Sequence, residues 1–229
     1  MSEVVLIVGA GEGLSGSLAR RFAREGSRIV LAARTPGKLR DVAAATRAHV
    51  VRCDASVRAD VEALFAECDG GPGSPDIVVY NASGRLRGPL VDLDADAVKL
   101  ALDVSAFGGF LVAQAAAKRM LAKGRGTILL TGASASVKGY AQSAPFAMGK
   151  FALRGLAQSM ARELQPRNIH VAHFVIDGGI RSASRPVPAE SPDSLLDPDA
   201  IADTYFHVAR QARSAWTSEV ELRPWVEKF

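Results

Sequence analysis

The chain has 229 residues, 48% of them hydrophobic and 23% charged, which is typical of a globular protein with a sizeable core and excludes a disordered chain. The net charge of +4 comes from scattered basic residues, so the composition indicates no nucleic-acid surface. Cys53 and Cys68 lack metal-ligand spacing, and we expect two free thiols and no metal site. No secretory leader is recognisable, and no uncharged apolar run reaches the roughly 18 residues of a membrane span. These features predict a cytoplasmic protein with no membrane partner.

Apolar, β-branched runs alternate with amphipathic stretches along the whole chain. Strands are predicted over 4–8, 28–32, 49–52, 77–80, 127–130, 169–176 and 217–222. Helices are predicted over 14–25, 38–47, 57–68, 92–122, 145–164 and 199–213. This alternation indicates an α/β fold with a parallel sheet covered by helices on both faces. Because no linker interrupts the pattern, a single domain over 1–229 is expected.

The proline- and serine-rich segment 181–198 is long for a loop inside a compact domain. Such loops often cover a binding site, and we expect 181–198 to cover a substrate. A surface excursion without function is the alternative.

The first predicted strand is followed by a glycine-rich turn, VGAGEGLSG. Gly9, Gly11 and Gly13 allow the backbone to turn tightly and to approach a pyrophosphate. The N–H groups at the start of the next helix, near Leu14, would face its negative charge. Strand, glycines and helix in this order predict a dinucleotide site at the carboxyl ends of the strands.

The end of the second predicted strand bears on the choice of cofactor. An acidic residue there would bind the ribose 2′-hydroxyl of NAD, but this chain has Ala33 followed by Arg34. A guanidinium can bind a 2′-phosphate, so NADP(H) is favoured over NAD(H). A solvated surface arginine is the alternative interpretation of Arg34.

The order of these motifs resembles the short-chain dehydrogenase/reductase family over almost the whole chain. The glycine turn is similar to that family's, with Ser15 in place of the last glycine, and Asp54 resembles its adenine-binding aspartate. The stretch YNASG, with Asn81 and Gly84, resembles the family's N-A-G motif, and Lys150 matches the lysine of its Y-x-x-x-K motif.

The resemblance implies a Rossmann-type, doubly wound parallel sheet of seven strands in the order 3-2-1-4-5-6-7. It also implies a homodimer or homotetramer, in which the helices over 92–122 and 145–164 pack against a partner subunit. The cofactor residues that it implies in this chain are Gly9, Gly11, Glu12, Gly13, Leu14, Arg34, Asp54, Ala55, Asn81, Ala82, Ser83, Lys150, Asp177, Gly178 and Ile180.

The catalytic positions depart from the family pattern. Phe146 stands where the family has its proton-donating tyrosine, and Ala133 where it has the serine that orients the substrate oxygen. Ser134 is adjacent to Ala133, so a shift of the loop by one residue would bring a hydroxyl close to the position of that serine. The family's relay asparagine falls on Ser105. Glu12 also stands where many NADP-dependent members have a basic residue, which weighs against NADP.

A phenylalanine cannot donate a proton, so another group would have to. Tyr140 is the preferred substitute, because its phenol has the most suitable pKa among the candidates. The other candidates are Ser134, Ser136, Ser143 and Asp177. His173 is expected to be a core histidine.

Two functions remain open. The first is an oxidoreductase that binds NADP(H) and acts on a small carbonyl or alcohol through a non-standard proton relay. The second is a catalytically silent nucleotide-binding subunit or sensor.

Overall fold

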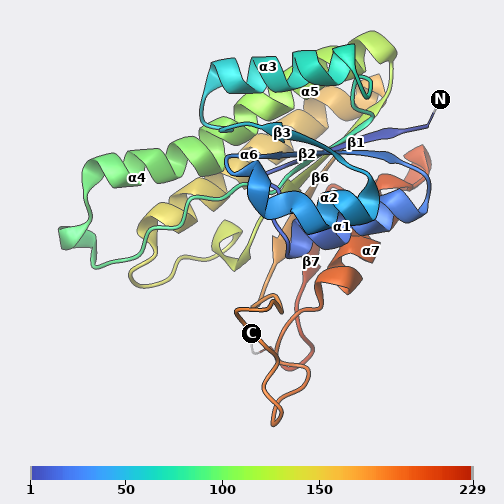
Figure 1. Cartoon of the computed structure of the whole chain (residues 1–229). Helices are drawn as coiled ribbons and strands as arrows, with labels where there is room; N and C mark the ends of the chain where they lie inside the picture. Colours follow the sequence, from blue (N-terminus) through green and yellow to red (C-terminus); the bar gives the residue numbers. More distant parts are fainter. Residues whose placement is uncertain (1, 228–229) are drawn as a thin grey trace.

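The computed structural model describes residues 2–227, and its centre is a parallel sheet (Figure 1). The seven strands are β1 (Val4–Val8), β2 (Arg28–Ala33), β3 (His49–Arg52), β4 (Ile77–Tyr80), β5 (Gly126–Thr131), β6 (Ile169–Ile176) and β7 (Glu219–Leu222). They lie in the order β3-β2-β1-β4-β5-β6-β7, and every neighbouring pair is parallel. The predicted seven-stranded Rossmann-type sheet and its strand order are confirmed.

Helices cover both faces of the sheet. The helices are α1 (Leu14–Arg24), α2 (Arg40–Thr46), α3 (Arg58–Gly70), α4 (Ala95–Leu102), α5 (Gly108–Lys123), α6 (Ala144–Leu164) and α7 (Pro198–Ala209). Figure 1 shows α3, α5 and α6 on one face and α1, α2 and α7 on the other. Parallel strands need such crossover connections, which bury the sheet on both sides.

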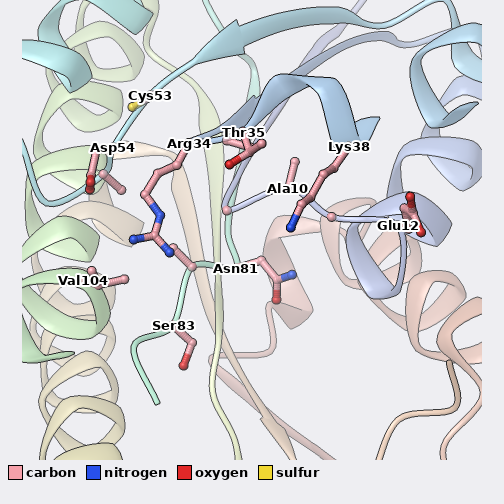
Figure 2. A pocket seen from close by; sticks show the side chains of 15 residues that line it. Ala10, Glu12, Arg34, Thr35, Lys38, Cys53, Asp54, Asn81, Ser83 and Val104 are labelled. Atoms are coloured by element: carbon pink, nitrogen blue, oxygen red, sulfur yellow. The ribbon is translucent and has the colours of Figure 1, made fainter. Parts of the chain in front are cut away.

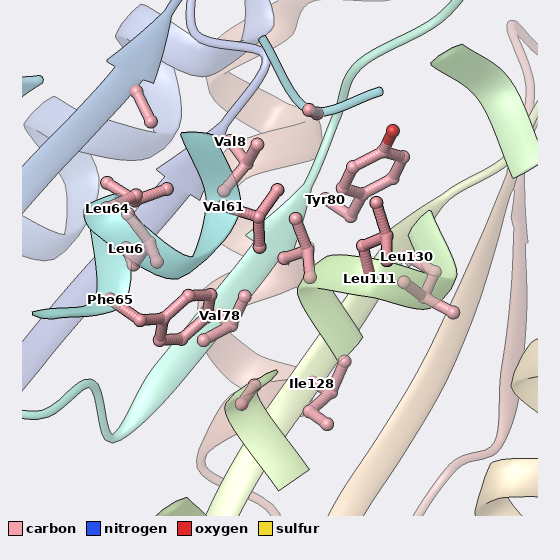
Figure 3. Close-up of a cluster of buried hydrophobic side chains, with 14 of the residues drawn as sticks. Leu6, Val8, Val61, Leu64, Phe65, Val78, Tyr80, Leu111, Ile128 and Leu130 are labelled. Carbon is pink, nitrogen blue, oxygen red and sulfur yellow. The ribbon is translucent and has the colours of Figure 1, made fainter. Parts of the chain in front are cut away.

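Each face of the sheet has its own hydrophobic core. On the α3/α5 side, Leu6, Val78 and Ile128 from the sheet pack with Phe65 and Leu111 from the helices (Figure 3). On the other side, alternate strand residues pack against α1 and α7. The strands therefore read as continuous apolar runs, because successive side chains enter opposite cores.

The single helix predicted over 92–122 is interrupted. A π-helical turn, Asp103–Phe107, joins α4 to α5. By length and composition Ala95–Lys123 could cross a membrane, and it is the one such helix among residues 2–227. Leu111, Val112, Ala116 and Met120 of this segment belong to the core beneath the sheet, which is the placement of a core helix.

Several boundaries differ from the predictions at element ends. Helix α7 ends at Ala209 rather than near residue 213, and the short 3-10 turn Arg213–Ala215 follows it. The helix predicted from residue 38 is preceded by the 3-10 turn Pro36–Leu39. Helix ends fray readily, because their terminal backbone groups lack intrahelical partners.

Candidate functional site

Two adjoining cavities lie at the carboxyl ends of the strands, where β1 neighbours both β2 and β4. In an open parallel sheet, this change in strand order opens a crevice for ligands. The first cavity has a volume of about 510 Å³ and the second about 460 Å³. Asn81 and Ser83 line both, so the two cavities adjoin and together form a groove along the carboxyl ends of the strands.

The predicted glycine turn forms one wall of the first cavity. Gly9 has φ of +80°, and a Cβ at this position would lie 2.3 Å from the Ala82 backbone nitrogen. Only glycine therefore allows the turn to pass this close to the end of β4. By contrast, a Cβ on Gly11 or Gly13 would meet no atom within 4 Å, so the turn faces open space.

The start of α1 offers unpaired backbone donors next to this turn. Its N-cap is Gly13, and no side chain caps the helix. The first N–H groups of a helix have no intrahelical acceptor and carry partial positive charge. This end of the cavity can therefore bind an anion.

Ser15, the residue in place of the family's last glycine, connects the turn to β4. Its hydroxyl donates to the Gly9 carbonyl oxygen at 3.3 Å and accepts from Asn81 Nδ2 at 2.7 Å. The Asn81 side chain is thus held by Ser15, while its backbone N–H donates to Val8. These bonds hold the ends of β1 and β4 and the start of α1 together.

Basic side chains border the first cavity at the end of β2. Figure 2 shows Arg34 and Lys38 extending over the cavity, with Thr35 between them. The Asp54 carboxylate lies on the same wall and accepts from both the backbone N–H and the hydroxyl of Ser56. Although burial opposes it, these hydrogen bonds together with Arg34 and Arg52 lower the pKa of Asp54. Glu12 is an exposed acidic group on the opposite wall.

Lys150 lies in the second cavity and is almost completely buried. Its side chain is 3% exposed, and its Nζ donates to the Thr131 carbonyl oxygen at 2.7 Å. Burial, with a further contribution from the positive charge of Arg85, lowers the pKa of Lys150 to about 7. Phe146 stands one helical turn earlier on α6 and lines the same cavity.

The loop between β5 and α6 supplies further residues of the second cavity. Ala133, Ser134, Tyr140 and Ser143 all line the second cavity. Ser136 does not, because its hydroxyl accepts from the Ala133 backbone N–H at 3.1 Å. The structure thus brings Tyr140 and Ser134 to the cavity that holds Lys150.

Besides Ser136, three predicted site residues line neither cavity: Gly13, Ser105 and Asp177. Gly13 instead lines a neighbouring cavity at the start of α1. Ser105 is fully buried in the π-helical turn, where its hydroxyl accepts from the Gly84 backbone N–H at 2.8 Å. Asp177 is 3% exposed, and its carboxylate lies 3.5 Å from Lys138 and 3.3 Å from Arg223. Its neighbours Gly178 and Ile180 do line the second cavity.

His173 is a core residue, as its position within a buried strand predicts. It is 1% exposed on β6, and its Nδ1 lies 3.1 Å from Glu219 Oε2. Burial outweighs this carboxylate and lowers the pKa of His173 to about 4, so the ring is neutral at neutral pH. Cys53 and Cys68 are free, buried thiols whose pKa values burial raises to about 12.

Sequence reasoning missed several residues around the groove. Lys38, four residues after Arg34, was detectable as a second cation beyond the same strand. Arg85, Arg87 and Arg185 line the second cavity and belong to no motif. Their convergence depends on how two distant loops fold, which no local pattern reports.

Comparison with known proteins agrees with this architecture. Residues 3–185 match the family model for short chain dehydrogenases. An uncharacterized oxidoreductase of Staphylococcus aureus is 26% identical over 97% of both chains. Human 17-beta-hydroxysteroid dehydrogenase type 1 is 30% identical over 85% of this chain and 62% of its own length.

Solved structures give the same result. A short-chain dehydrogenase from Rhodopseudomonas palustris is 32% identical and covers 97% of this chain and 99% of its own, with a TM-score of 0.85. A metagenomic short-chain oxidoreductase in complex with NADP is 28% identical and covers 98% of both chains, with a TM-score of 0.83. The chain therefore belongs to the short-chain dehydrogenase family, an oxidoreductase family whose fold binds nicotinamide cofactors.

Proposed function

We propose that this protein is an NADP(H)-dependent oxidoreductase that interconverts a small carbonyl compound and its alcohol through a non-standard proton relay. The observation that carries the proposal is the groove formed by the two adjoining cavities. The first cavity has the glycine turn and the two cations Arg34 and Lys38. The second cavity contains the buried Lys150, whose pKa is lowered to about 7.

The first cavity fits the adenosine half of a dinucleotide. The open face of Gly11 and Gly13 and the uncapped start of α1 suit the pyrophosphate. Asp54 and Ala55 would contact the adenine, and Ala82 and Ser83 the adjoining ribose. Gly178 and Ile180, with Lys150, would border the nicotinamide end in the second cavity.

Arg34 and Lys38 support NADP(H) over NAD(H). Neither side chain has an ion pair or hydrogen bond to another side chain within residues 2–227, so both are available to a 2′-phosphate. Glu12 lies on the opposite wall of the same cavity and opposes phosphate binding. Arg34 and Lys38 supply two cations at the end of β2 against the exposed Glu12 carboxylate, while the Asp54 carboxylate accepts hydrogen bonds from Ser56.

Proton delivery must differ from the family's usual relay. Phe146 occupies the register of the donor tyrosine and Ala133 that of the orienting serine, and both line the second cavity. When bound, the nicotinamide supplies the hydride that reduces the carbonyl carbon. In the proposed reaction, the ammonium of Lys150 would provide the proton to the carbonyl oxygen through a bridging water.

Lys150 suits this role because its pKa of about 7 is close to neutrality. Ser134 would donate a hydrogen bond that orients the substrate oxygen. Tyr140 is the alternative donor, since its phenol reaches the same cavity from the loop. A Tyr140→Phe variant should distinguish these two proton donors. The variant should lose activity if Tyr140 is the donor and keep it if Lys150 is the donor.

The segment 181–198 supports a substrate-covering role. Ile180 and Leu196 form a β-bridge, Arg181 N–H donates to the Leu196 carbonyl oxygen at 2.9 Å, and Arg185 lines the second cavity. These bonds hold the base of the loop beside the groove. We propose one domain over 1–229, with this loop as its cover.

A homodimer or homotetramer is also proposed. Large apolar side chains are exposed on α4–α6 and the turn between α4 and α5: Leu100, Phe107, Phe110, Met148 and Phe151. Burial of such a patch against a second copy would remove apolar area from water. Light scattering on the purified protein measures the subunit number, and a monomer would refute this part of the proposal.

The rival function is a catalytically silent nicotinamide-nucleotide-binding subunit or sensor. The observation that favours it is the apolar pair Phe146 and Ala133 at the reacting end of the groove. A screen of aldehydes and ketones for NADPH oxidation separates the two functions. Oxidation of NADPH by at least one carbonyl supports the enzyme, and activity that appears only in a double variant, Ala133→Ser with Phe146→Tyr, supports the silent binder.

The cofactor assignment is tested first. Titration with NADPH and NADH, followed by nicotinamide fluorescence, should give tighter binding of NADPH. Failure to bind either nucleotide would refute both functions. If NADPH oxidation is then found, a Tyr140→Phe variant that retains it excludes Tyr140 as the donor, and a variant that loses it excludes the Lys150 relay.

A further inference from the structure

Three arginines converge on the second cavity beside Lys150. Arg85 and Arg87 follow β4, whereas Arg185 comes from the loop after β6. The lining residues include these four cations and no Asp or Glu. Within residues 2–227, none of the three guanidinium groups has an ion pair or hydrogen bond to another side chain.

The clustering of these like charges is unfavourable in the absence of an anion. Burial, followed by the positive charges of Arg185 and Arg87, lowers the pKa of Arg85. Arg85 also lies over the Phe146 ring, with its Cζ 5.1 Å from the ring centroid. The guanidinium of Arg85 therefore stands directly above the position where the family has its catalytic tyrosine.

Hydrogen bonds hold the Arg85–Arg87 segment across the cavity at both ends. Gly84 N–H donates to Ser105 Oγ at 2.8 Å, and Gly88 N–H donates to the Gln142 carbonyl oxygen at 3.1 Å. A Cβ on Gly84 would lie 2.7 Å from the Ala101 Cα, so the segment is pressed onto α4. The buried Ser105 hydroxyl therefore positions the arginines rather than lining the cavity itself.

The phosphates of the cofactor do not account for Arg85 and Arg87. The glycine turn and the cations at the end of β2 lie in the first cavity, and neither Arg85 nor Arg87 lines it. Arg185 is different, because it also lines a small cavity with Gly13 and Leu14, at the start of α1. Arg185 can thus serve the pyrophosphate, which leaves Arg85 and Arg87 for a second anion.

We propose that the substrate is a carbonyl compound that carries a carboxylate, held by Arg85 and Arg87 while its carbonyl group faces Lys150. The proposal rests on the oxidoreductase function proposed above. A guanidinium binds a carboxylate through two parallel N–H···O bonds, which fixes orientation as well as charge. Leu86, Ile176 and Ile180 line the same cavity and suit an apolar portion between the two groups.

The reaction balances without a further reactant. An oxo acid, NADPH and one proton give the hydroxy acid and NADP⁺. The carbonyl carbon gains the hydride and its oxygen gains the proton, while the carboxylate remains unchanged and bound. Oxidation of a hydroxy acid is the same reaction in reverse.

Three matched aldehydes test the proposal by activity: para-formylbenzoate, its methyl ester and benzaldehyde. The wild-type protein should show the highest kcat/KM for the free acid. At about pH 6, where Lys150 is protonated in the wild type and in the variants, Arg85→Gln and Arg87→Gln should each reduce kcat/KM for the acid by roughly 10- to 100-fold. At the same pH they should leave kcat/KM for the ester within about threefold. Arg85→Lys keeps the positive charge but loses the two parallel N–H donors, so its kcat/KM for the acid should lie between those of the wild type and Arg85→Gln. Arg125→Gln, at an exposed position, is the matched control.

A binding measurement makes the test independent of turnover. Calorimetry of para-formylbenzoate with the protein saturated in NADP⁺ should show binding that Arg85→Gln and Arg87→Gln weaken by a similar factor. Equal binding of the ester, unchanged binding in both variants, or stronger competition by inorganic phosphate than by benzoate would overturn the carboxylate site. Carboxylate binding by a protein that reduces no aldehyde would refute the oxidoreductase and leave the anion site standing.

Discussion

Replacement of Lys150 by methionine should stabilise the protein at neutral pH while it removes the proposed proton source. Methionine has nearly the length of the lysine stem, so it fills the same space between β5 and α6 without a charge. Lys150 is 3% exposed, and burial lowers its pKa from 10.5 to about 7. The unfolded chain therefore binds more protons than the folded protein between these two values.

The magnitude follows from this difference. One pKa unit corresponds to about 1.4 kcal/mol, so the charged lysine disfavours folding by about 5 kcal/mol below pH ~7. Loss of the hydrogen bond to the Thr131 carbonyl oxygen costs about 1–3 kcal/mol, because that acceptor is left buried. The net gain for Lys150→Met is therefore about 2–4 kcal/mol at about pH 6.

The gain should shrink as the pH rises. Above about pH 7 the folded wild type carries a neutral amine, and its free energy of unfolding increases with pH until the unfolded lysine also loses its proton near 10.5. Urea unfolding of wild type and Lys150→Met at about pH 6 and about pH 9 measures this trend. Lys118→Met, an exposed lysine of α5, is the control and should show no such trend. A ΔΔG that is the same at both pH values would refute a lowered pKa for Lys150.

Three further predictions concern the cofactor site, the proton source and the glycine turn. Arg34→Ala should weaken NADPH binding by roughly 10- to 100-fold and change NADH binding little, as measured by fluorescence titration; equal losses for both nucleotides would exclude a 2′-phosphate contact. For carbonyl reduction, kcat/KM should fall as the pH rises through about 7, because Lys150 loses its proton. Arg85→Gln removes a like charge, so it should raise the pKa of Lys150 and move this fall in kcat/KM to higher pH. The neighbouring His173 is already neutral near pH 7 and would not contribute to this fall. If the fall in kcat/KM occurs at the same pH in Arg85→Gln as in the wild type, Lys150 is not the donor. Gly9→Ala should lower the free energy of unfolding by about 3 kcal/mol or more, since it combines a positive φ with a clash against Ala82. Gly37→Ala, whose Cβ would meet open space, is the control. Equal effects of the two substitutions in urea unfolding would contradict the close approach of Gly9 to Ala82.

The order of strands and helices could be predicted from the sequence because it depends on local patterns. Continuous apolar runs mark strands that are buried on both faces, and glycines placed between strand and helix mark a phosphate-binding turn. The strand order itself came from the family resemblance, since pairing between distant strands leaves no local signal. The lengths of the helices near residues 92–122 and 199–213 were less predictable, because a π-helical turn and a frayed end depend on the packing around them.

The candidate site divides in the same way. The sequence by itself determined the glycine turn, Arg34 and the register of Phe146 and Lys150, because spacing along one strand or helix sets these positions. Only the tertiary structure decided that Arg85 and Arg185, a hundred residues apart in the chain, face the same cavity. It also placed the Ser105 hydroxyl on the Gly84 backbone instead of in the cavity. Convergence of distant loops is set by packing against a shared core, and packing is a property of the folded chain rather than of any segment.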